Sequence, residues 1–181
     1  MELRQETVHI YKHGYSDIAK LFKESFPEGE QFPLWALRLL TTLKPAKFSA
    51  FYEGDTLAGI LYSIESTDYF FILYLAVNPK FRSCGYGGKI LEYAFEEAGD
   101  RPIVLNVEAL DENADNNEQR KRRNKFYARH GIIDTGYIIE DDGVTYSVLS
   151  SSLDTFSPKS YEKMLLNISF GVLNRGVTKQ K

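Results

Sequence analysis

One short loop combines the residue types that bind phosphates. It reads Arg82, Ser83, Cys84, Gly85, Tyr86, Gly87 and Gly88, and it lies between an apolar run and an amphipathic segment. If a helix follows the loop, free backbone N–H groups converge there and the helix dipole is positive there. Glycines have no side chain, so a pyrophosphate can approach the backbone closely. The loop therefore predicts a site for an anionic ligand, and a turn that binds nothing is the alternative.

The segments on either side are those that such a site needs. Phe70–Val77 has the length and the aromatic and β-branched content of a strand buried on both faces, and Pro79 ends it because proline lacks a ladder donor. In residues 89–98 the apolar side chains recur at helical spacing, and Gly99 followed by Pro102 ends the helix. We therefore expect a strand, a glycine loop and a helix in that order.

The spacing of the glycines distinguishes between phosphate-binding motifs. It fits neither the dinucleotide fingerprint of Rossmann folds nor the P-loop. The pattern is Arg82-x-x-Gly85-x-Gly87, and residues 74–79 before it read Tyr-Leu-Ala-Val-Asn-Pro. It closely resembles the acetyl-CoA signature of the GNAT superfamily of N-acetyltransferases, in which Gln/Arg-x-x-Gly-x-Gly/Ala follows a strand ending in an apolar-Ala-Val-x-Pro run.

A second segment is similar to another motif of the same superfamily. Residues 126–132 match its Phe-Tyr-x-x-x-Gly-Phe pattern, with Ile132 in place of the last phenylalanine. The resemblance places the catalytic tyrosine at Tyr127, near the CoA sulfur. A phenol with a pKa of about 10 is protonated at neutral pH, so it suits a general acid for a thiolate leaving group whose thiol has a pKa of about 8.5. A core tyrosine is the alternative.

The resemblance also implies how acetyl-CoA is held. The pantetheine arm lies between the fourth and fifth strands like an extra strand, and the loop amides hold the pyrophosphate. Many relatives carry an asparagine seven residues before the tyrosine, where this chain has Arg120, and Asn124 is the candidate for that contact. The implied cofactor-binding residues are Leu75, Ala76, Val77, Arg82, Ser83, Cys84, Gly85, Tyr86, Gly87, Gly88 and Asn124.

The acceptor site is expected near the first two helices, because in the resembling family this helix pair overhangs the entrance for the acceptor. The candidates are Phe26, Glu28, Glu30, Phe32 and Trp35. Ordinary core is the alternative for the aromatic residues, and a solvated loop is the alternative for the two glutamates. Their negative charge suits a cationic amine such as a polyamine, an aminoglycoside, a lysine or a protein N-terminus.

A general base is also needed, because a lysine-like amine is mostly protonated at pH 7. Glu108, at the end of the fifth expected strand, is the first candidate, and Glu65 and Asp111 are weaker ones. A solvated carboxylate with no catalytic role is the alternative for each. The family often uses chains of water and backbone groups in place of one fixed base.

The whole pattern predicts a mixed α/β, GNAT-like domain with a six- to seven-stranded, mainly antiparallel sheet, helices on both faces and an extra C-terminal helix. The expected strands are residues 6–11, 47–53, 56–65, 70–77, 103–108, 132–140 and 144–149. The first expected helix begins near Ser16, which is its cap. The other expected helices span residues 34–43, 89–98, 118–130 and 159–173. Residues 179–181 are expected to fray.

Length and composition favour one acetyltransferase domain over residues 1–181, with a core of about 1–153 and a helical appendage over 154–181. The apolar stripe of that appendage needs cover from the domain or from a second subunit, so a homodimer is a candidate assembly. The net charge of −3 argues against a nucleic-acid partner, and the basic run 120–125 is interpreted as a solvated helix face.

Cellular setting and cofactors are constrained more weakly. A single cysteine and the lack of an apolar N-terminal segment favour a reduced, cytoplasmic setting, and no run is long enough to cross a membrane. His9, His13 and His130 show no metal-binding spacing, so no metal is expected. An N-acetyltransferase acting on a small-molecule or peptide amine is thus the predicted function. An idle CoA-binding or sensing module and an interaction subunit are the alternatives.

Overall fold

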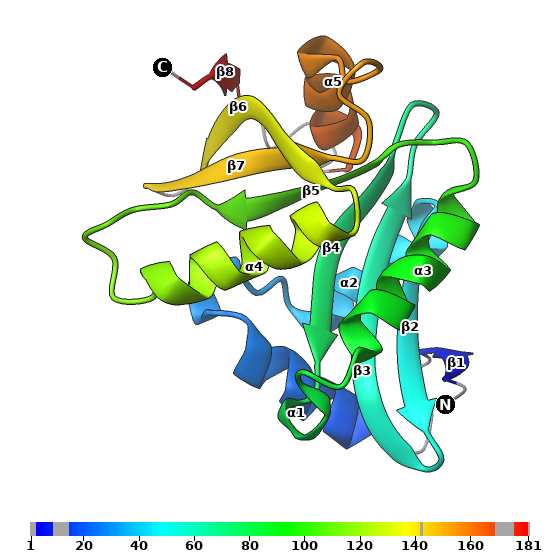
Figure 1. Cartoon of the computed structure of the whole chain (residues 1–181). Helices are drawn as coiled ribbons and strands as arrows, with labels where there is room; N and C mark the ends of the chain where they lie inside the picture. The colour runs from blue at the N-terminus through cyan, green and yellow to red at the C-terminus, as the bar shows by residue number, and fades with distance from the viewer. Residues whose placement is uncertain (1–2, 9–14, 142, 169–175, 181) are drawn as a thin grey trace. The chain divides into compact units, whose positions relative to one another are not determined.

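The computed structural model describes residues 3–8, 15–141, 143–168 and 176–180. The chain divides into two compact units (Figure 1): Met1–Glu65 with Ile72–Glu97, and Ser66–Phe71 with Ala98–Lys181. Strand β4 (Phe70–Val77) begins in the second unit and continues in the first. In the described residues the strands form one eight-stranded sheet in the order β1-β2-β3-β4-β5-β7-β6-β8. The predicted fold class, mixed α/β with a mainly antiparallel sheet, is confirmed, but the described sheet has eight strands where six to seven were predicted, because residues 177–179 add a strand.

The first unit contains the glycine-rich loop of residues 82–88 and both N-terminal helices. Its elements are β1 (Arg4–Thr7), α1 (Tyr15–Ser25), the short 3-10 helix η1 (Glu28–Glu30), α2 (Leu34–Leu43), β2 (Ala46–Glu53), β3 (Thr56–Glu65), most of β4, η2 (Pro79–Phe81) and α3 (Tyr86–Ala98). Strand β2 pairs antiparallel with β1 on one side and with β3 on the other. The hairpin between β2 and β3 turns at Gly54, which has a positive φ of 56°.

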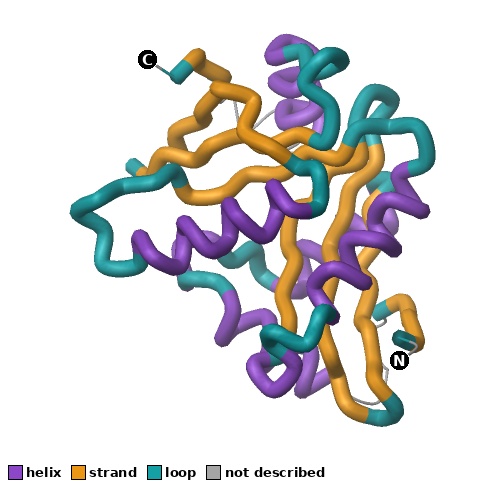
Figure 2. The backbone as a smooth tube through the Cα atoms, viewed as in Figure 1, coloured by secondary structure: helices purple, strands orange, loops and turns teal. Residues whose placement is uncertain are grey.

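Helices cover both faces of the strands in this unit. Alternate residues of a strand point to opposite faces, and here both faces carry apolar side chains that a helix buries. On one face the ring of Phe48 lies 5.5 Å from that of Tyr62, and the Tyr62 hydroxyl donates a 2.7 Å hydrogen bond to the Leu37 carbonyl of α2. On the other face the ring of Phe51 lies 5.1 Å from that of Tyr93 in α3. Figure 2 shows the helix α3 running along β2 and β3 on this second face.

The second unit begins with the first residues of β4. Its other elements are β5 (Ile103–Glu108), α4 (Asn117–Arg129), β6 (Ile133–Asp141), β7 (Val144–Ser150), α5 (Pro158–Ile168) and β8 (Val177–Lys179). The pairs β5–β7, β7–β6 and β6–β8 are all antiparallel. The Phe70 N–H of β4 donates a 3.0 Å hydrogen bond to the Pro102 carbonyl just before β5.

Helix α5 buries its apolar stripe within its own unit. The ring of Tyr161 is fully buried, lies 5.8 Å from that of Phe156 and 6.3 Å from that of Tyr69, and its hydroxyl bonds Asn106 Oδ1 at 2.6 Å. Met164 and Leu165 are also buried. These three side chains of α5 therefore need no second subunit to cover them.

Two predictions near the N-terminus are wrong. The first strand is Arg4–Thr7 instead of residues 6–11, of which residues 9–11 lie outside the described part of the chain. It is a polar edge strand that pairs with residues 49–52 of β2, so apolar residues do not mark it. Ser16 does not cap α1, because it already lies inside the helix.

Two further differences concern β4 and α3. Leu73, Leu75 and Val77 of β4 are only half-buried, so the strand is not buried on both faces along its whole length as predicted. Helix α3 begins at Tyr86, three residues earlier than predicted. Gly87 and Gly88 therefore belong to its first turn.

The C-terminal part also departs from the prediction. Instead of fraying, Lys179 lies in β8, where it pairs with Tyr137 of β6. Helix α5 begins at Pro158 and is described to Ile168; the predicted continuation to residue 173 lies outside the described residues. Among the helices that the structure describes, all are too short or too polar to cross a lipid bilayer.

Candidate functional site

The predicted cofactor-binding run, residues 82–88, follows η2 and ends in the first turn of α3; we call residues 79–88 the cofactor loop. Contacts within the first unit hold this loop. Asn78 caps η2, because its Oδ1 accepts a 3.1 Å hydrogen bond from the Lys80 N–H. The Asn78 side-chain amide donates to the Leu57 carbonyl of β3 at 2.8 Å, which fixes the start of the loop on the sheet. Ser83 and Gly85 have positive φ angles of 62° and 84°, and they turn the backbone into α3.

The cofactor loop is exposed along most of its length, and from Ser83 to Gly85 its side chains are short or absent. Arg82, Ser83, Cys84 and Gly85 are all exposed. The Cys84 thiol lies 3.4 Å from the Arg82 carbonyl, and Tyr86 is buried with its ring 5.0 Å from that of Phe81. The first amides of α3 have no carbonyl acceptor within the helix, so the loop and the helix start together offer N–H donors to an anion.

Close packing beneath the loop explains why α3 lies so near the sheet. A Cβ atom on Gly59 of β3 would lie 2.6 Å from both the Ala76 carbonyl oxygen of β4 and Cδ1 of Ile90 in α3. Only glycine fits there without a shift of backbone. Nothing in the sequence singles out Gly59, because a lone glycine inside a strand pattern does not reveal which atoms approach it.

The predicted acceptor residues lie between the end of α1 and the first turn of α2 in the same unit: Glu28 and Glu30 on η1, Trp35 on α2, and Phe26 and Phe32 in the connections on either side of η1. Phe32 and Trp35 expose 42% and 67% of their surface, so neither belongs to the core. Glu28 is exposed in η1 and Glu30 is half-buried. Phe26 differs, because its ring packs 5.3 Å from that of Phe22, which fits the alternative of ordinary core for that residue.

In the second unit, Tyr127 lies on α4 and exposes only 7% of its surface. Burial raises the pKa of its phenol to about 12, against the opposing effect of the Arg123 charge. The hydroxyl is therefore protonated across the neutral range, as a general acid must be. The last residue of the motif, Ile132, is fully buried, and its N–H donates a 3.0 Å hydrogen bond to the Tyr127 carbonyl.

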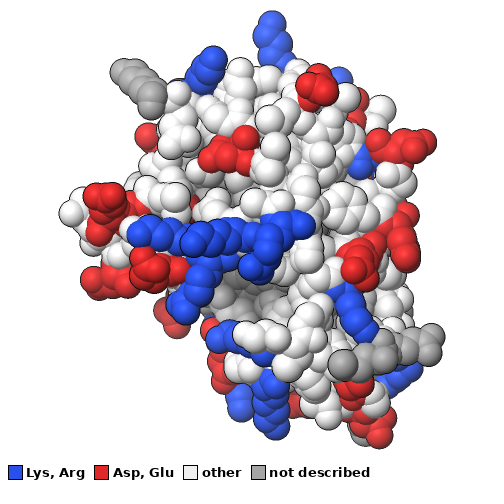
Figure 3. All heavy atoms as spheres, in the orientation of Figure 1, with Lys and Arg blue, Asp and Glu red and all other residues white. Residues whose placement is uncertain are grey.

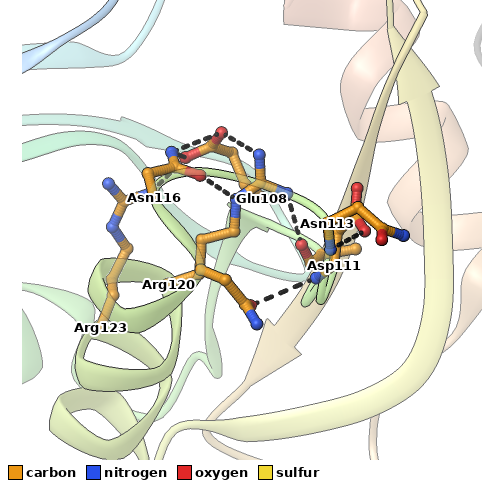
Figure 4. Close-up of polar contacts among 8 residues, drawn as sticks. Glu108, Asp111, Asn113, Asn116, Arg120 and Arg123 are labelled. Atoms are coloured by element: carbon orange, nitrogen blue, oxygen red, sulfur yellow. Dashed lines mark hydrogen bonds and ion pairs between the residues drawn. The ribbon is translucent and has the colours of Figure 1, made fainter.

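Glu108 is the centre of a buried polar cluster in the same unit (Figure 4). It exposes 8% of its surface, and its carboxylate accepts from Arg120 Nη2 at 2.8 Å and from Arg123 Nη1 at 3.4 Å. Asn116 Nδ2 lies 3.3 Å from both carboxylate oxygens. The cluster thus ties the end of β5 to α4, the helix that carries Tyr127.

Arg120 is committed to this cluster through three of its nitrogens. Besides Glu108, it donates from Nε to Asn116 Oδ1 at 2.8 Å and from Nη1 to the Ala109 carbonyl at 2.7 Å. Asn124 donates from its side chain to the Arg120 carbonyl one turn earlier at 3.0 Å. The structure therefore gives the unusual Arg120 a structural partner, which the sequence pattern alone did not indicate.

The weaker base candidates have other surroundings. Asp111 is exposed, and its carboxylate accepts from the Asn113 N–H at 2.9 Å, as a turn residue does (Figure 4). Glu65 is half-buried at the end of β3 in the first unit. The first unit thus holds every predicted cofactor and acceptor residue except Asn124, and the second holds Asn124, Tyr127 and Glu108.

The basic run on α4 forms a line of positive charge on the surface (Figure 3). Lys121 pairs with Glu118 at 2.9 Å, and the side chains of Arg122 and Lys125 are exposed. Among the described residues there is no group of three or more His, Cys, Asp or Glu side chains placed to hold a metal ion. His9 and His13 lie outside the described residues.

Residues 45–131 match the family model of the acetyltransferase (GNAT) domain. No curated protein matches the chain. A protein from Bacteroides thetaiotaomicron, described as an acetyltransferase of the GNAT family, is 26% identical, with a TM-score of 0.72 over 94% of this chain and 99% of the other.

Two structures with bound molecules share the fold. Arabidopsis thaliana Naa50 in complex with the bisubstrate analogue CoA-Ac-MVNAL is 18% identical, with a TM-score of 0.61 over 84% of this chain and 99% of the other. A GNAT family acetyltransferase from Elizabethkingia anophelis with acetyl-CoA bound is 13% identical, with a TM-score of 0.58 over 82% and 96%. Residues 45–131 thus carry the sequence of a GNAT acetyltransferase domain, and the solved structures that share the fold of the chain are GNAT family acetyltransferases.

Proposed function

We propose that this chain is an N-acetyltransferase that transfers the acetyl group of acetyl-CoA to a primary amine by direct attack. The amine nitrogen attacks the thioester carbonyl, an N–C bond forms, the C–S bond breaks and CoA leaves as a thiolate. The acceptor ammonium gives up two protons over the reaction, the thiolate takes one, and one is released. The observation that carries the proposal is the glycine loop before α3, which lies within the GNAT match.

Acetyl-CoA is proposed to bind with its pyrophosphate against the cofactor loop and the first turn of α3. The support is the exposed backbone at Gly85 and the N–H donors of the helix start. The pantetheine arm is proposed to pair with the backbone of Leu75 and Val77. Replacing those two side chains should then matter less than replacing the loop glycines.

Tyr127 is proposed as the general acid that protonates the CoA thiolate. Its phenol has a pKa of about 12, so it holds its proton at every pH at which the enzyme would work. A positioned proton donor typically contributes a factor of about 10² to 10⁴ in rate. Loss of the hydroxyl should therefore reduce kcat by at least about a hundredfold.

Glu108 is proposed as the base that takes the proton of the acceptor, directly or through water. Its contacts also favour a structural role, because Arg120, Arg123 and Asn116 occupy both carboxylate oxygens. The variant Glu108→Gln separates these roles. A base predicts a large loss of kcat with little change in Tm. An anchor for α4 predicts a lower Tm with kcat largely retained.

The proposed acceptor is a cationic amine, since Glu28 is an exposed carboxylate and the neighbouring Phe32 and Trp35 offer apolar surface. The bisubstrate analogue bound by Naa50 includes a peptide, which makes a peptide N-terminus one acceptor to test. A polyamine and an aminoglycoside represent the other cationic classes.

An idle CoA-binding module is the second candidate, because Tyr127 is almost fully buried and Glu108 is already ion-paired. Calorimetry with acetyl-CoA, followed by thiol release in the presence of spermidine, kanamycin A or the pentapeptide MVNAL, tests both candidates. Amine-dependent thiol release that Tyr127→Phe abolishes and Tyr137→Phe retains supports the enzyme. Binding of acetyl-CoA without release of thiol for any amine supports the idle module, and no binding at all overturns both.

A further inference from the structure

One buried hydroxyl holds both ends of a three-residue segment. Tyr74 Oη of β4 donates a 2.6 Å hydrogen bond to the Glu30 carbonyl and accepts a 3.0 Å hydrogen bond from the Phe32 N–H. A phenol has one proton to donate, and here that proton goes to Glu30. These contacts join residues that are more than forty positions apart in the chain. They fix the backbone of residues 28–32, which we call the acceptor loop.

The residue between those two contacts is also held. Gln31 Nε2 donates to the Phe26 carbonyl at 2.6 Å and to the Lys23 carbonyl at 3.2 Å, near the end of α1. The Glu30 N–H also bonds the Pro27 carbonyl at 2.9 Å within η1. Three successive residues of the acceptor loop are thus hydrogen-bonded to groups beneath them.

Tyr74 is itself rigidly placed. It exposes 4% of its surface, and its ring lies 4.9 Å from that of Phe22 and 4.7 Å from that of Phe26, both edge-on. Burial raises the pKa of its phenol to about 12, so the hydroxyl keeps its proton and its hydrogen bond to Glu30 at neutral pH. The two ring contacts therefore hold the Tyr74 hydroxyl in place for its hydrogen bonds to the loop.

The side chains that the acceptor loop displays differ from those that hold it. Phe32 is fixed through its N–H, yet 42% of its surface is exposed, and Glu28 is exposed at the other end of the loop. An apolar ring and a carboxylate are therefore presented to solvent on a backbone that is already ordered. A binding surface ordered in advance loses less entropy when a ligand binds.

From these contacts we propose that Tyr74 is a positioning residue that sets the affinity for the acceptor amine by fixing the acceptor loop. This inference rests on the proposed acetyltransferase function. Tyr74 acts through Glu28 and Phe32 and takes no part in proton transfer. The variant Tyr74→Phe keeps the ring contacts and removes both hydrogen bonds to the loop.

The effects expected of Tyr74→Phe fall on the acceptor side alone. The KM for the acceptor should rise about tenfold. That factor corresponds to the loss of roughly one net hydrogen bond that orders the acceptor loop. The Kd for acetyl-CoA should stay within about twofold of wild type, and kcat at saturating acceptor should change little. Amide hydrogen exchange of the peptide covering residues 26–34 should become at least about ten times faster.

Tyr62→Phe is the matched control. The Tyr62 hydroxyl is also buried and also donates one hydrogen bond to a backbone carbonyl, but that carbonyl belongs to Leu37 in α2. The variant removes a comparable buried hydroxyl from the same face of the sheet and leaves the acceptor loop bonded. It should leave the acceptor KM and the exchange of residues 26–34 near wild type.

The experiment measures both variants with spermidine, kanamycin A and the pentapeptide MVNAL, together with hydrogen exchange. A higher acceptor KM and faster exchange in Tyr74→Phe alone support the inference. Faster exchange with an unchanged acceptor KM overturns it, and so does an equal rise of KM in Tyr62→Phe. Failure of the proposed function appears differently, as a wild-type protein that releases no thiol with any of the three amines.

Discussion

The two loops of the first unit differ in where their main contacts come from. In the cofactor loop, the Asn78 cap and the positive φ angles at Ser83 and Gly85 act within a few positions of the chain, and the Asn78 amide also ties the start of the loop to Leu57 of β3. The acceptor loop has local contacts through Gln31 and also depends on Tyr74, more than forty positions away. The first loop thus takes its turns mainly from its own sequence, while the second needs a side chain from the middle of a distant strand.

This difference fits what the two loops are proposed to bind. A pyrophosphate needs only N–H donors and space, which one local backbone turn can supply. An acceptor amine is recognised by side chains, so its loop needs a support that is separate from the side chains it displays. Glu28 and Phe32 can be replaced without touching the hydroxyl of Tyr74.

The largest effect is expected from Gly87→Val, which tests the cofactor loop alone. Gly87 lies in the first turn of α3, where a branched side chain would stand between the helix amides and the pyrophosphate. Affinity for acetyl-CoA should fall at least about a hundredfold by calorimetry. Valine is no worse than glycine in a helix, so Tm should hold. Acetyl-CoA binding as tight as wild type would remove the loop from the proposed site.

Alkaline pH should lower the stability of the fold through two buried tyrosines, Tyr74 beneath the acceptor loop and Tyr127 on α4. The pKa of Tyr74 and that of Tyr127 are each raised to about 12 by burial, whereas an unfolded tyrosine titrates near 10. Above about pH 10 the unfolded chain loses these protons first, so the free energy of unfolding falls as pH rises and the loss is complete above about pH 12. Each tyrosine should contribute roughly 1 kcal/mol of that loss at pH 11.

Urea denaturation between pH 8 and pH 11 measures this loss of stability. Tyr74→Phe and Tyr127→Phe should each make the dependence on pH less steep, because each variant removes one titrating group. If neither variant changes the dependence of the free energy of unfolding on pH, the alkaline loss of stability comes from other groups.

A pair of glycine variants contrasts the two loops directly. Gly85 in the cofactor loop has a φ of 84°, which an alanine adopts only with strain, although nothing lies within 4 Å of the added Cβ. Gly29 in the acceptor loop has open space as well and no positive φ. Gly85→Ala should lower the free energy of unfolding by about 1 kcal/mol, and Gly29→Ala should leave it unchanged or raise it slightly. Equal losses in urea melts would contradict the contrast.

The same difference between local and distant contacts separates what the sequence predicted from what it missed. The bounds of β4, β5 and α2 were predicted to the residue, because each is marked by a local apolar pattern and a proline, glycine or charged residue at its end. The cofactor loop was found in the same way. A local pattern is enough wherever the structure is local.

The parts that were missed depend on contacts between distant positions. Arg120 was noticed only as a departure from the family pattern, and its pairing with Glu108 follows from how α4 packs on β5. Strand β8 exists because Val177–Lys179 meets the edge of β6, and three residues are too few to show a period. The hydrogen bonds of Tyr74 gave no signal, since its ring looks like any other core residue of a strand.

The smallest effect concerns Trp35, the only tryptophan of the chain, which lies three residues beyond the acceptor loop. Because 67% of its surface is exposed, its fluorescence should be quenched readily by acrylamide. Saturating amine should reduce the quenching constant by about a third if the acceptor binds beside the acceptor loop, while CoA alone should leave it unchanged. Tyr74→Phe should shift this protection to higher amine concentrations. Protection by CoA alone would mean that the cofactor does not bind at the cofactor loop alone. The difference between the two loops would then concern how they fold and not which substrate each one binds.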